Sequence, residues 1–173
     1  MALVPELDAV YNITISTGGG VINYAEFQNN TTPGVVQPVA TSPASTILSF
    51  SGVVGGGTSP PTLAGGGTQI VINNTGVYKV LFSIQYRQGG TNPTLEVWFT
   101  LNGVNIPNSA SEQITQSNSN GIITVEFIFS LSAGNILCLL ANSSGNNTGI
   151  LTLPPTATAP QSPAIVLTIM RIA

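Results

Sequence analysis

Apolar and polar residues alternate with a period of two along much of this chain, most clearly over residues 76–87. Every second side chain there is large and apolar, and this set is Tyr78, Val80, Phe82, Ile84 and Tyr86. A strand with one face in a protein core alternates in this way. Asn, Thr and Gly residues precede the segment and Gln88-Gly89-Gly90 follows it, so turn-forming residues mark both ends. We therefore predict a long central strand over 76–87.

The remaining apolar segments are predicted to be further strands, since in none of them do apolar residues recur with the spacing of a helix. The predicted strands cover residues 21–27, 47–51, 69–72, 95–101, 122–131, 136–140, 150–153 and 164–172. Asn102-Gly103 is a strong hairpin signal between two of these runs. The glycine-rich segment 55–68 is expected to be an irregular excursion. The sequence thus predicts an all-β, antiparallel sandwich of the jelly-roll type.

Some strands carry apolar side chains on both faces, which predicts self-association. In the last strand Ile165, Leu167 and Ile169 share one face, while Val166, Met170 and Ile172 share the other. Such a strand needs its own core on one side and another chain on the other side. Leu81 and Ile128 also point away from the core faces of their strands. We assign the interface between chains to Tyr24, Leu81, Trp98, Ile128, Leu167 and Ile169.

Composition excludes several partners. Only 5% of the 173 residues are charged, against roughly 25% in typical soluble domains. The three basic residues cannot form the positive track that nucleic acids require. The longest apolar run, 136–141, is far shorter than the roughly 20 residues that span a bilayer. The N-terminus lacks the pattern of a secretory signal, so we expect synthesis in the cytosol without a signal peptide and no membrane insertion.

The length fits one domain, preceded by a short segment of different character. We expect residues 21–173 to form a single jelly-roll domain and residues 1–20, which end at Gly18-Gly19-Gly20, to form an arm for attachment or assembly. The apolar residues of that arm are Leu3, Val4, Leu7 and Tyr11.

Little in the sequence supports catalysis or cofactor binding. The chain has no histidine, so Ser-His-Asp and Cys-His arrangements cannot form. Its single cysteine, Cys138, lies in an apolar strand and is expected to be buried. Glu96 and Glu126 could form an acid and base pair, but solvated or interface positions fit them better. Trp98 is either an interface anchor or a platform for a sugar, and we favour the interface.

Three segments resemble the tumour necrosis factor and complement globular-head superfamily. Residues 76–83 are similar to its Gly-x-Tyr-x-apolar-x-Phe strand, residues 131–139 to its Leu-x-x-Gly-Asp turn, and residues 163–169 to its last strand. The resemblance implies a ten-stranded jelly roll that forms a homotrimer through its inner sheet. Asn135 stands where that family has Asp, so no calcium site and no cofactor are expected.

Residues 23–27 and 97–109 resemble the form of this domain in virion surface proteins of phages and large DNA viruses. They are also similar to the heads of bacterial spore-surface glycoproteins. The resemblance implies a non-enzymatic structural protein at the virion surface, such as a minor capsid, cap, spike or fibre-head component. It would contact other capsid proteins through the arm. The alternatives are a spore-coat or appendage filament subunit at a spore or cell surface, and a head that binds a cell-surface glycan or receptor through its loops.

Overall fold

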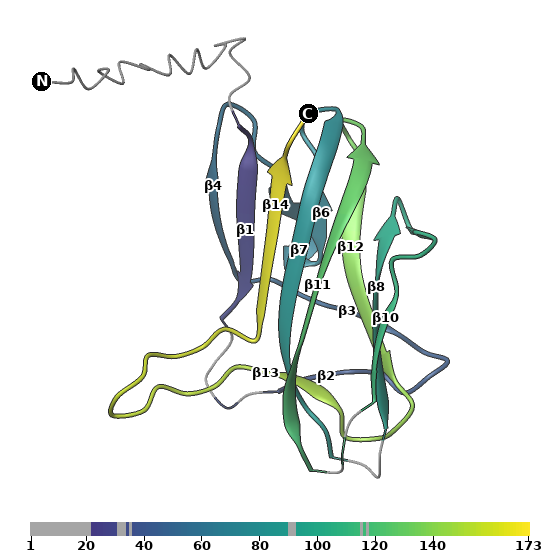
Figure 1. Cartoon of the computed structure of the whole chain (residues 1–173), viewed down its shortest axis with the longest axis vertical. Coiled ribbons are helices and arrows are strands. Elements are labelled where there is room, and N and C mark those ends of the chain that lie inside the picture. The colour runs from purple at the N-terminus through teal and green to yellow at the C-terminus, as the bar shows by residue number, and fades with distance from the viewer. Residues whose placement is uncertain (1–21, 31–33, 35, 90–92, 115, 117) are drawn as a thin grey trace, which may run out of the picture.

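Two antiparallel sheets pack face to face, and each turns the apolar side of its strands toward the other (Figure 1). The computed structural model describes residues 22–30, 34, 36–89, 93–114, 116 and 118–173. The alternation of apolar and polar positions explains this arrangement, because successive side chains of a strand point to opposite faces of its sheet. The prediction of an all-β antiparallel jelly roll is confirmed. The predicted arm, residues 1–20, lies outside the described residues.

The first layer, here called the β7 sheet, is centred on the strand that the sequence predicted most clearly. Its strands are β4 (Gly52–Gly56), β1 (Tyr24–Asn29), β14 (Ile165–Arg171), β7 (Gly76–Arg87), β11 (Asn120–Leu131), β13 (Gly149–Leu151) and β2 (Val36–Pro38). Figure 1 shows β4, β1, β14, β7 and β11 side by side in this order. The first strand of the described chain, β1, therefore lies beside the last strand, β14, which pairs on its other edge with β7 from the middle of the chain.

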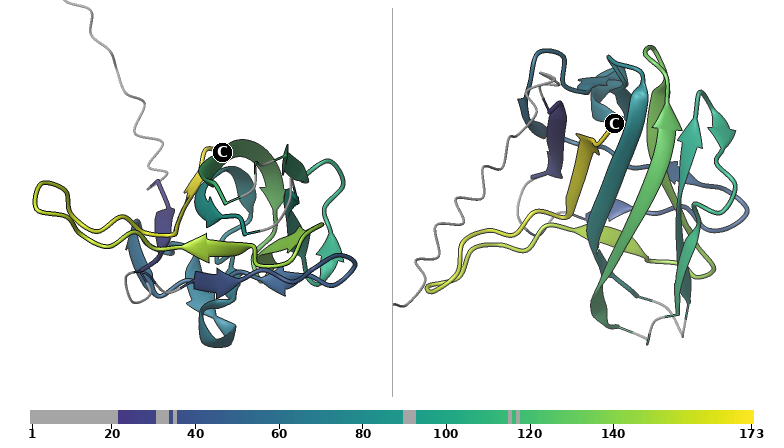
Figure 2. Two further views of the ribbon diagram at one scale, coloured as in Figure 1. Left: turned by 90° about the horizontal axis from the view of Figure 1, so that it is seen from below. Right: turned by 45° about the horizontal axis from the view of Figure 1, so that its top comes forward.

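The second layer, the β8 sheet, covers the apolar side of the first, and Figure 2 shows the two layers from below and in an oblique view with the top turned forward. Its strands are β5 (Thr62–Ala64), β6 (Gln69–Val71), β12 (Ile136–Ser143), β8 (Thr94–Leu101), β10 (Ser111–Ile114), β3 (Thr46–Ile47) and β9 (Val104–Asn105). Asn102 and Gly103 join β8 to β9 with φ of 51° and 82°, the left-handed values of a tight hairpin.

Helical structure in the described part of the chain is limited to one short 3-10 turn, η1 (Gly65–Gly67). In these residues no helix has the length and apolar character that crossing a membrane requires.

Backbone pairing on both edges of β7 sets the register of the first layer. β11 pairs with β7 over its whole length, from Asn120 opposite Arg87 to Leu131 opposite Gly76. On the other edge β14 pairs with it from Ile165 opposite Ile84 onward. Because side chains alternate, this register decides which residues of β11 and β14 enter the core.

Aromatic rings join the two layers in the centre of the core. Phe82 of β7 and Phe99 of β8 are fully buried, and their ring centroids are 5.8 Å apart. Phe99 also contacts the edges of Phe127 and Phe129 at 5.8 Å and 5.6 Å. Such edge-to-face pairs add to the hydrophobic stabilisation of the core.

Glycine-rich sequence hides two strands from prediction. β5 (Thr62–Ala64) lies wholly within the segment 55–68 and pairs with β6, and β4 is the second. β4 lies partly in the segment 55–68, for which an irregular excursion was expected, yet it pairs with β1 from Gly56 opposite Tyr24 to Gly52 opposite Gln28. A side chain at Gly56 would meet the Tyr24 ring at 2.5 Å. The glycine therefore permits close packing beside Tyr24 instead of signalling a loop.

We expect the variant Phe99→Ala to lower the free energy of unfolding by about 3–5 kcal/mol, because it removes the ring that contacts three other phenylalanines. Chemical denaturation at a fixed protein concentration measures this change. Val104→Ala serves as the control, since Val104 is 70% exposed and its loss should change stability by less than about 0.5 kcal/mol. Similar losses of unfolding free energy in the two variants would contradict the conclusion that Phe99 stabilises the core.

Candidate functional site

The outward face of the β7 sheet carries a group of apolar side chains that the described part of the chain leaves uncovered. We call this surface the assembly face, and its apolar members are Tyr24, Val54, Leu81, Ile122, Ile128 and Met170. The strand register places them in rows. Tyr24 lies opposite Met170, Met170 opposite Lys79, and Lys79 opposite Ile128, so one row crosses four strands.

The exposure of these side chains is high for residues of their size. Val54, Ile122 and Ile128 are each 63% exposed, and Tyr24 is 42% exposed. Single exposed apolar residues are common on protein surfaces, but a contiguous group marks a site of interaction. The arrangement over neighbouring strands therefore makes the assembly face the leading candidate for a functional surface.

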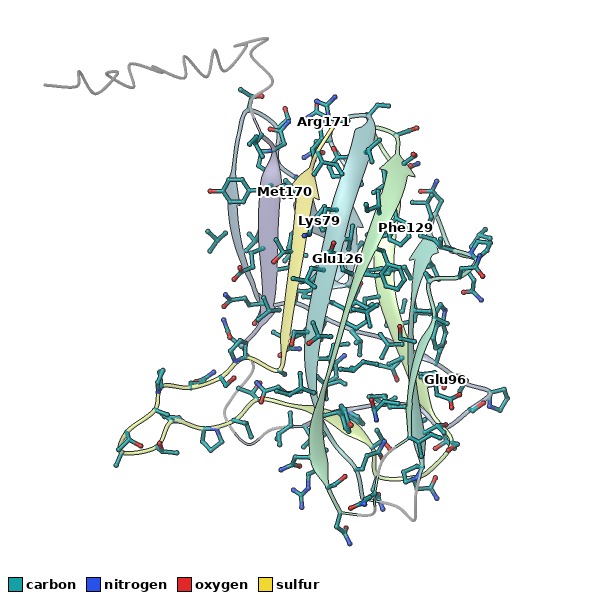
Figure 3. All side chains as sticks on the ribbon, viewed as in Figure 1. Lys79, Glu96, Glu126, Phe129, Met170 and Arg171 are labelled. Atoms are coloured by element: carbon teal, nitrogen blue, oxygen red, sulfur yellow. The ribbon has the colours of Figure 1, made fainter. Side chains whose placement is uncertain are left out.

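An ion pair lies within the assembly face. The Lys79 ammonium is 2.8 Å from a carboxylate oxygen of Glu126, with both side chains about half exposed (Figure 3). A pair exposed to water contributes only about 0–1 kcal/mol to stability. The sequence allows Lys79 to pair with Glu126 at a boundary between subunits, whereas the structure forms this pair within one chain. The face therefore presents a neutralised pair and no unpaired charge at these two positions.

The edge of the sheet continues the apolar surface. Within the described part of the chain β11 pairs only with β7, so its second edge has no strand beside it. Phe127 and Phe129 of β11 are half-buried there, and their rings stack with centroids 5.5 Å apart. Ile128, between them in sequence, points to the assembly face. The two apolar surfaces thus meet along one strand.

The structure sorts the residues predicted for an interface into three groups. Tyr24, Leu81 and Ile128 lie on the assembly face, where the register brings them together. Leu167 and Ile169 are fully buried in the core of their own chain, so their assignment to an interface was wrong. Both faces of β14 are apolar, and the alternation alone does not indicate which face is inside.

Trp98 and the arm residues are not part of this surface. Trp98 belongs to β8 and points outward from the other layer, away from the assembly face. Leu3, Val4, Leu7 and Tyr11 lie outside the described residues. Sequence reasoning missed Val54, because it lies in a glycine-rich segment without alternation, although its pairing register sets it beside Glu26.

The described residues contain no group of three or more His, Cys, Asp or Glu side chains suited to hold a metal ion. The two glutamates considered as an acid and base pair do not meet. Glu96 lies on the β8 sheet and Glu126 on the assembly face, on different layers of the sandwich (Figure 3). Glu96 instead lies opposite Glu112 of β10.

The side chain of Cys138, the single cysteine, is buried and forms no disulfide. Cys138 of β12 is 7% exposed, and burial raises the pKa of its thiol, while a hydrogen bond with Thr100 acts in the opposite direction. A nucleophilic cysteine needs a lowered pKa, because the thiolate is the reactive form. The surroundings of Cys138 raise the pKa of its thiol instead, so they disfavour the thiolate.

No protein-family model matches the sequence, and no curated protein matches it. Solved structures do match the fold. A tumour necrosis factor, Eiger, from S. frugiperda superposes with a TM-score of 0.60 at 15% identity, covering 88% of this chain and 94% of that one. Murine APRIL at pH 5.0 gives a TM-score of 0.58 at 12% identity, covering 87% and 99%.

The globular domain of zebrafish complement 1qA gives a TM-score of 0.53 at 11% identity, covering 88% of this chain and 98% of that one. The similarity extends over nearly the whole described domain, whereas the identities are too low to carry function. The chain therefore has the jelly-roll fold shared by tumour necrosis factor, APRIL and the complement globular head.

Proposed function

We propose that this chain is a non-enzymatic structural head that forms a homotrimer through the assembly face and stands on the surface of a virus particle. The observation that carries the proposal is the row of uncovered apolar side chains on the β7 sheet, above all Ile128 at 63% exposure. Burial of such side chains yields roughly 25 cal/mol for each Å² removed from water. A second copy of the chain would supply that cover.

A trimer also agrees with the arrangement of two different apolar surfaces. A ring of three subunits joins one surface of each chain to a different surface of the next, unlike a twofold dimer. The assembly face and the β11 edge with Phe127 and Phe129 are two such surfaces, and they meet along β11. We propose that the edge of one copy packs against the assembly face of its neighbour.

The position on a virus particle is supported by composition and by the resemblance of residues 23–27 and 97–109. Only three basic residues are present, so the chain has few cleavage sites for trypsin-like proteases. Lys79 is held in a strand and in an ion pair. A protein with these properties suits the outside of a particle, where proteases are met. The attachment to neighbouring particle proteins would use the segment 1–20.

The variant Ile128→Glu should abolish the trimer, because a second carboxylate buried in the interface costs several kcal/mol, and the Lys79 ammonium opposite it already pairs with Glu126. Light scattering on the full-length chain should give three times the chain mass for the natural protein and the single-chain mass for the variant. Ile114→Glu is the matched control, since Ile114 is 68% exposed on β10 of the other layer. It should remain trimeric. An unchanged mass for Ile128→Glu would refute the interface.

The Cys138 thiol should stay unreactive, which tests the non-enzymatic assignment. Because burial raises its pKa above the usual 9.0, the thiolate is scarce at neutral pH, and its fraction should still be increasing above pH 9. Reaction with a chromogenic disulfide reagent, followed from pH 7 to 10, measures this dependence. Rapid reaction at pH 7 in the folded protein would contradict it, and the unfolded chain provides the reference rate.

Mass spectrometry of purified virus particles from the source should detect the chain at the outer surface, accessible to a labelling reagent that does not enter the particle. A chain without residues 1–17 should still form trimers but should enter particles at reduced occupancy. Normal occupancy of the shortened chain would refute attachment through the arm, and absence of the chain from particles would refute the location.

A further inference from the structure

A hollow of about 300 Å³ opens on the outward face of the β8 sheet, on the opposite side of the sandwich from the assembly face. Its walls come from β8, β9, β12 and the segment after β9. Trp98 contributes an aromatic ring, and the polar groups around it belong to Glu96, Asn105, Asn108 and Asn142. An aromatic side chain with a few convergent polar groups is the usual composition of a small-molecule site.

The indole of Trp98 is held in a fixed orientation. Its Nε1 donates a hydrogen bond to Oδ1 of Asn105 at 2.9 Å, across the hairpin from β8 to β9. The bond uses the only polar atom of the indole, so the flat apolar ring remains for contact with a ligand. The same bond directs the amide nitrogen of Asn105 away from the indole and leaves its donors for another acceptor.

The wall that carries Asn108 is also fixed in place. Ser109 is fully buried, and its hydroxyl accepts a hydrogen bond from the Phe99 amide at 3.0 Å and donates one to the Ile106 carbonyl at 2.8 Å. These bonds tie the segment 105–110 to β8. The hollow is therefore formed before any ligand binds, which lowers the entropy cost of binding.

The least exposed polar residue of the hollow has no hydrogen-bond partner for its side chain among the described residues. Asn142 is only 8% exposed, and its carboxamide makes no hydrogen bond with any residue that the structure describes. The side chains of Asn108 and Glu96 are likewise without a protein partner in that part of the chain. The polar atoms of these three side chains are open to the hollow, and a ligand with hydroxyl groups would take the place of water as their hydrogen-bond partner.

Charge limits the kind of ligand. Glu96 lies opposite Glu112, whereas all three basic residues belong to β7 and β14 of the other layer. An anionic ligand would meet the Glu96 carboxylate in the hollow, with Glu112 on the neighbouring strand and no cation, so phosphates, sulfates and acidic sugars are disfavoured. An uncharged ring with an apolar face and hydroxyl groups fits the indole and the carboxamides together.

We propose that this hollow binds an uncharged pyranose sugar, with the ring stacked on Trp98 and its hydroxyls paired with Asn105, Asn108, Asn142 and Glu96. A second hollow of about 390 Å³ lies on the same sheet face, lined by Thr100 and Leu140 among others. Leu140 is the cross-strand partner of Trp98, so the second hollow offers room for the next ring of a glycan. The inference does not rest on the proposed trimer, because the two surfaces are on opposite faces.

Trp98 is the only tryptophan of the chain, so its fluorescence reports on the site directly. The full-length protein is titrated with uncharged methyl glycosides of hexoses, 6-deoxyhexoses and N-acetylhexosamines, and with N-acetylneuraminic acid as the anionic probe. At least one uncharged glycoside should change the emission saturably, with a Kd in the range of about 1–10 mM, and the anionic sugar should not. No saturable change with any uncharged glycoside up to about 100 mM would overturn the proposal. Equal or tighter binding of the anionic sugar would also overturn it.

Asn142→Ala and Asn108→Ala should each weaken binding of that glycoside by about tenfold, because each removes hydrogen bonds to the sugar. The matched control Asn120→Ala changes an exposed residue of β11 and should leave the Kd unchanged. Equal affinity in all three variants would place the sugar elsewhere. The variant Ile128→Glu should bind as the natural chain does, so a failed trimer and a failed sugar site give different results.

Discussion

Backbone pairing along both edges of β7 is the constraint on which the rest of this structure depends. The twelve residues of β7 pair fully with β11 and along most of β14. Since side chains alternate, the inward position of Phe82 brings Val125 and Leu167 inward, while Leu81 keeps its neighbours Glu126 and Thr168 on the outside. A slip of one residue would exchange the core and the assembly face. One register therefore determines both.

The scarcity of charge gives the two outward faces their different properties. On the assembly face Lys79 and Glu126 neutralise each other among apolar side chains. Glu26, which shares this face with Thr168 and Val54, accepts a hydrogen bond from Gln28. Few charges therefore have to be desolvated when a second chain covers this face. On the β8 sheet Glu96 and Glu112 have no cation near them in the register, and carboxamides dominate the hollow. A sandwich has two outward faces, which allows one to serve assembly and the other to bind a ligand. The structural neighbours share the fold at 11–15% identity, so we infer the properties of the two faces from this chain's own side chains.

Much of the fold followed from local patterns. Alternation predicted the strand 76–87 at its observed bounds, and Asn102-Gly103 predicted the hairpin that the structure contains. The same alternation placed Leu81 and Ile128 on the outward faces of their strands, where they are found. These predictions succeed because they depend only on the period of two and on the backbone freedom of Asn and Gly. They need no knowledge of which strands are neighbours.

The sequence by itself thus determined the all-β class, the central strand and the residues that share each strand face. Only the tertiary structure decided which face of β14 is inside, because Leu167 and Met170 are both apolar and packing against β7 and β1 makes the choice. It also made a strand of Gly52–Gly56, through pairing with β1, and it collected Trp98 and Asn142 into one hollow. These features depend on contacts between segments far apart in the chain, which no local period of side chains can encode.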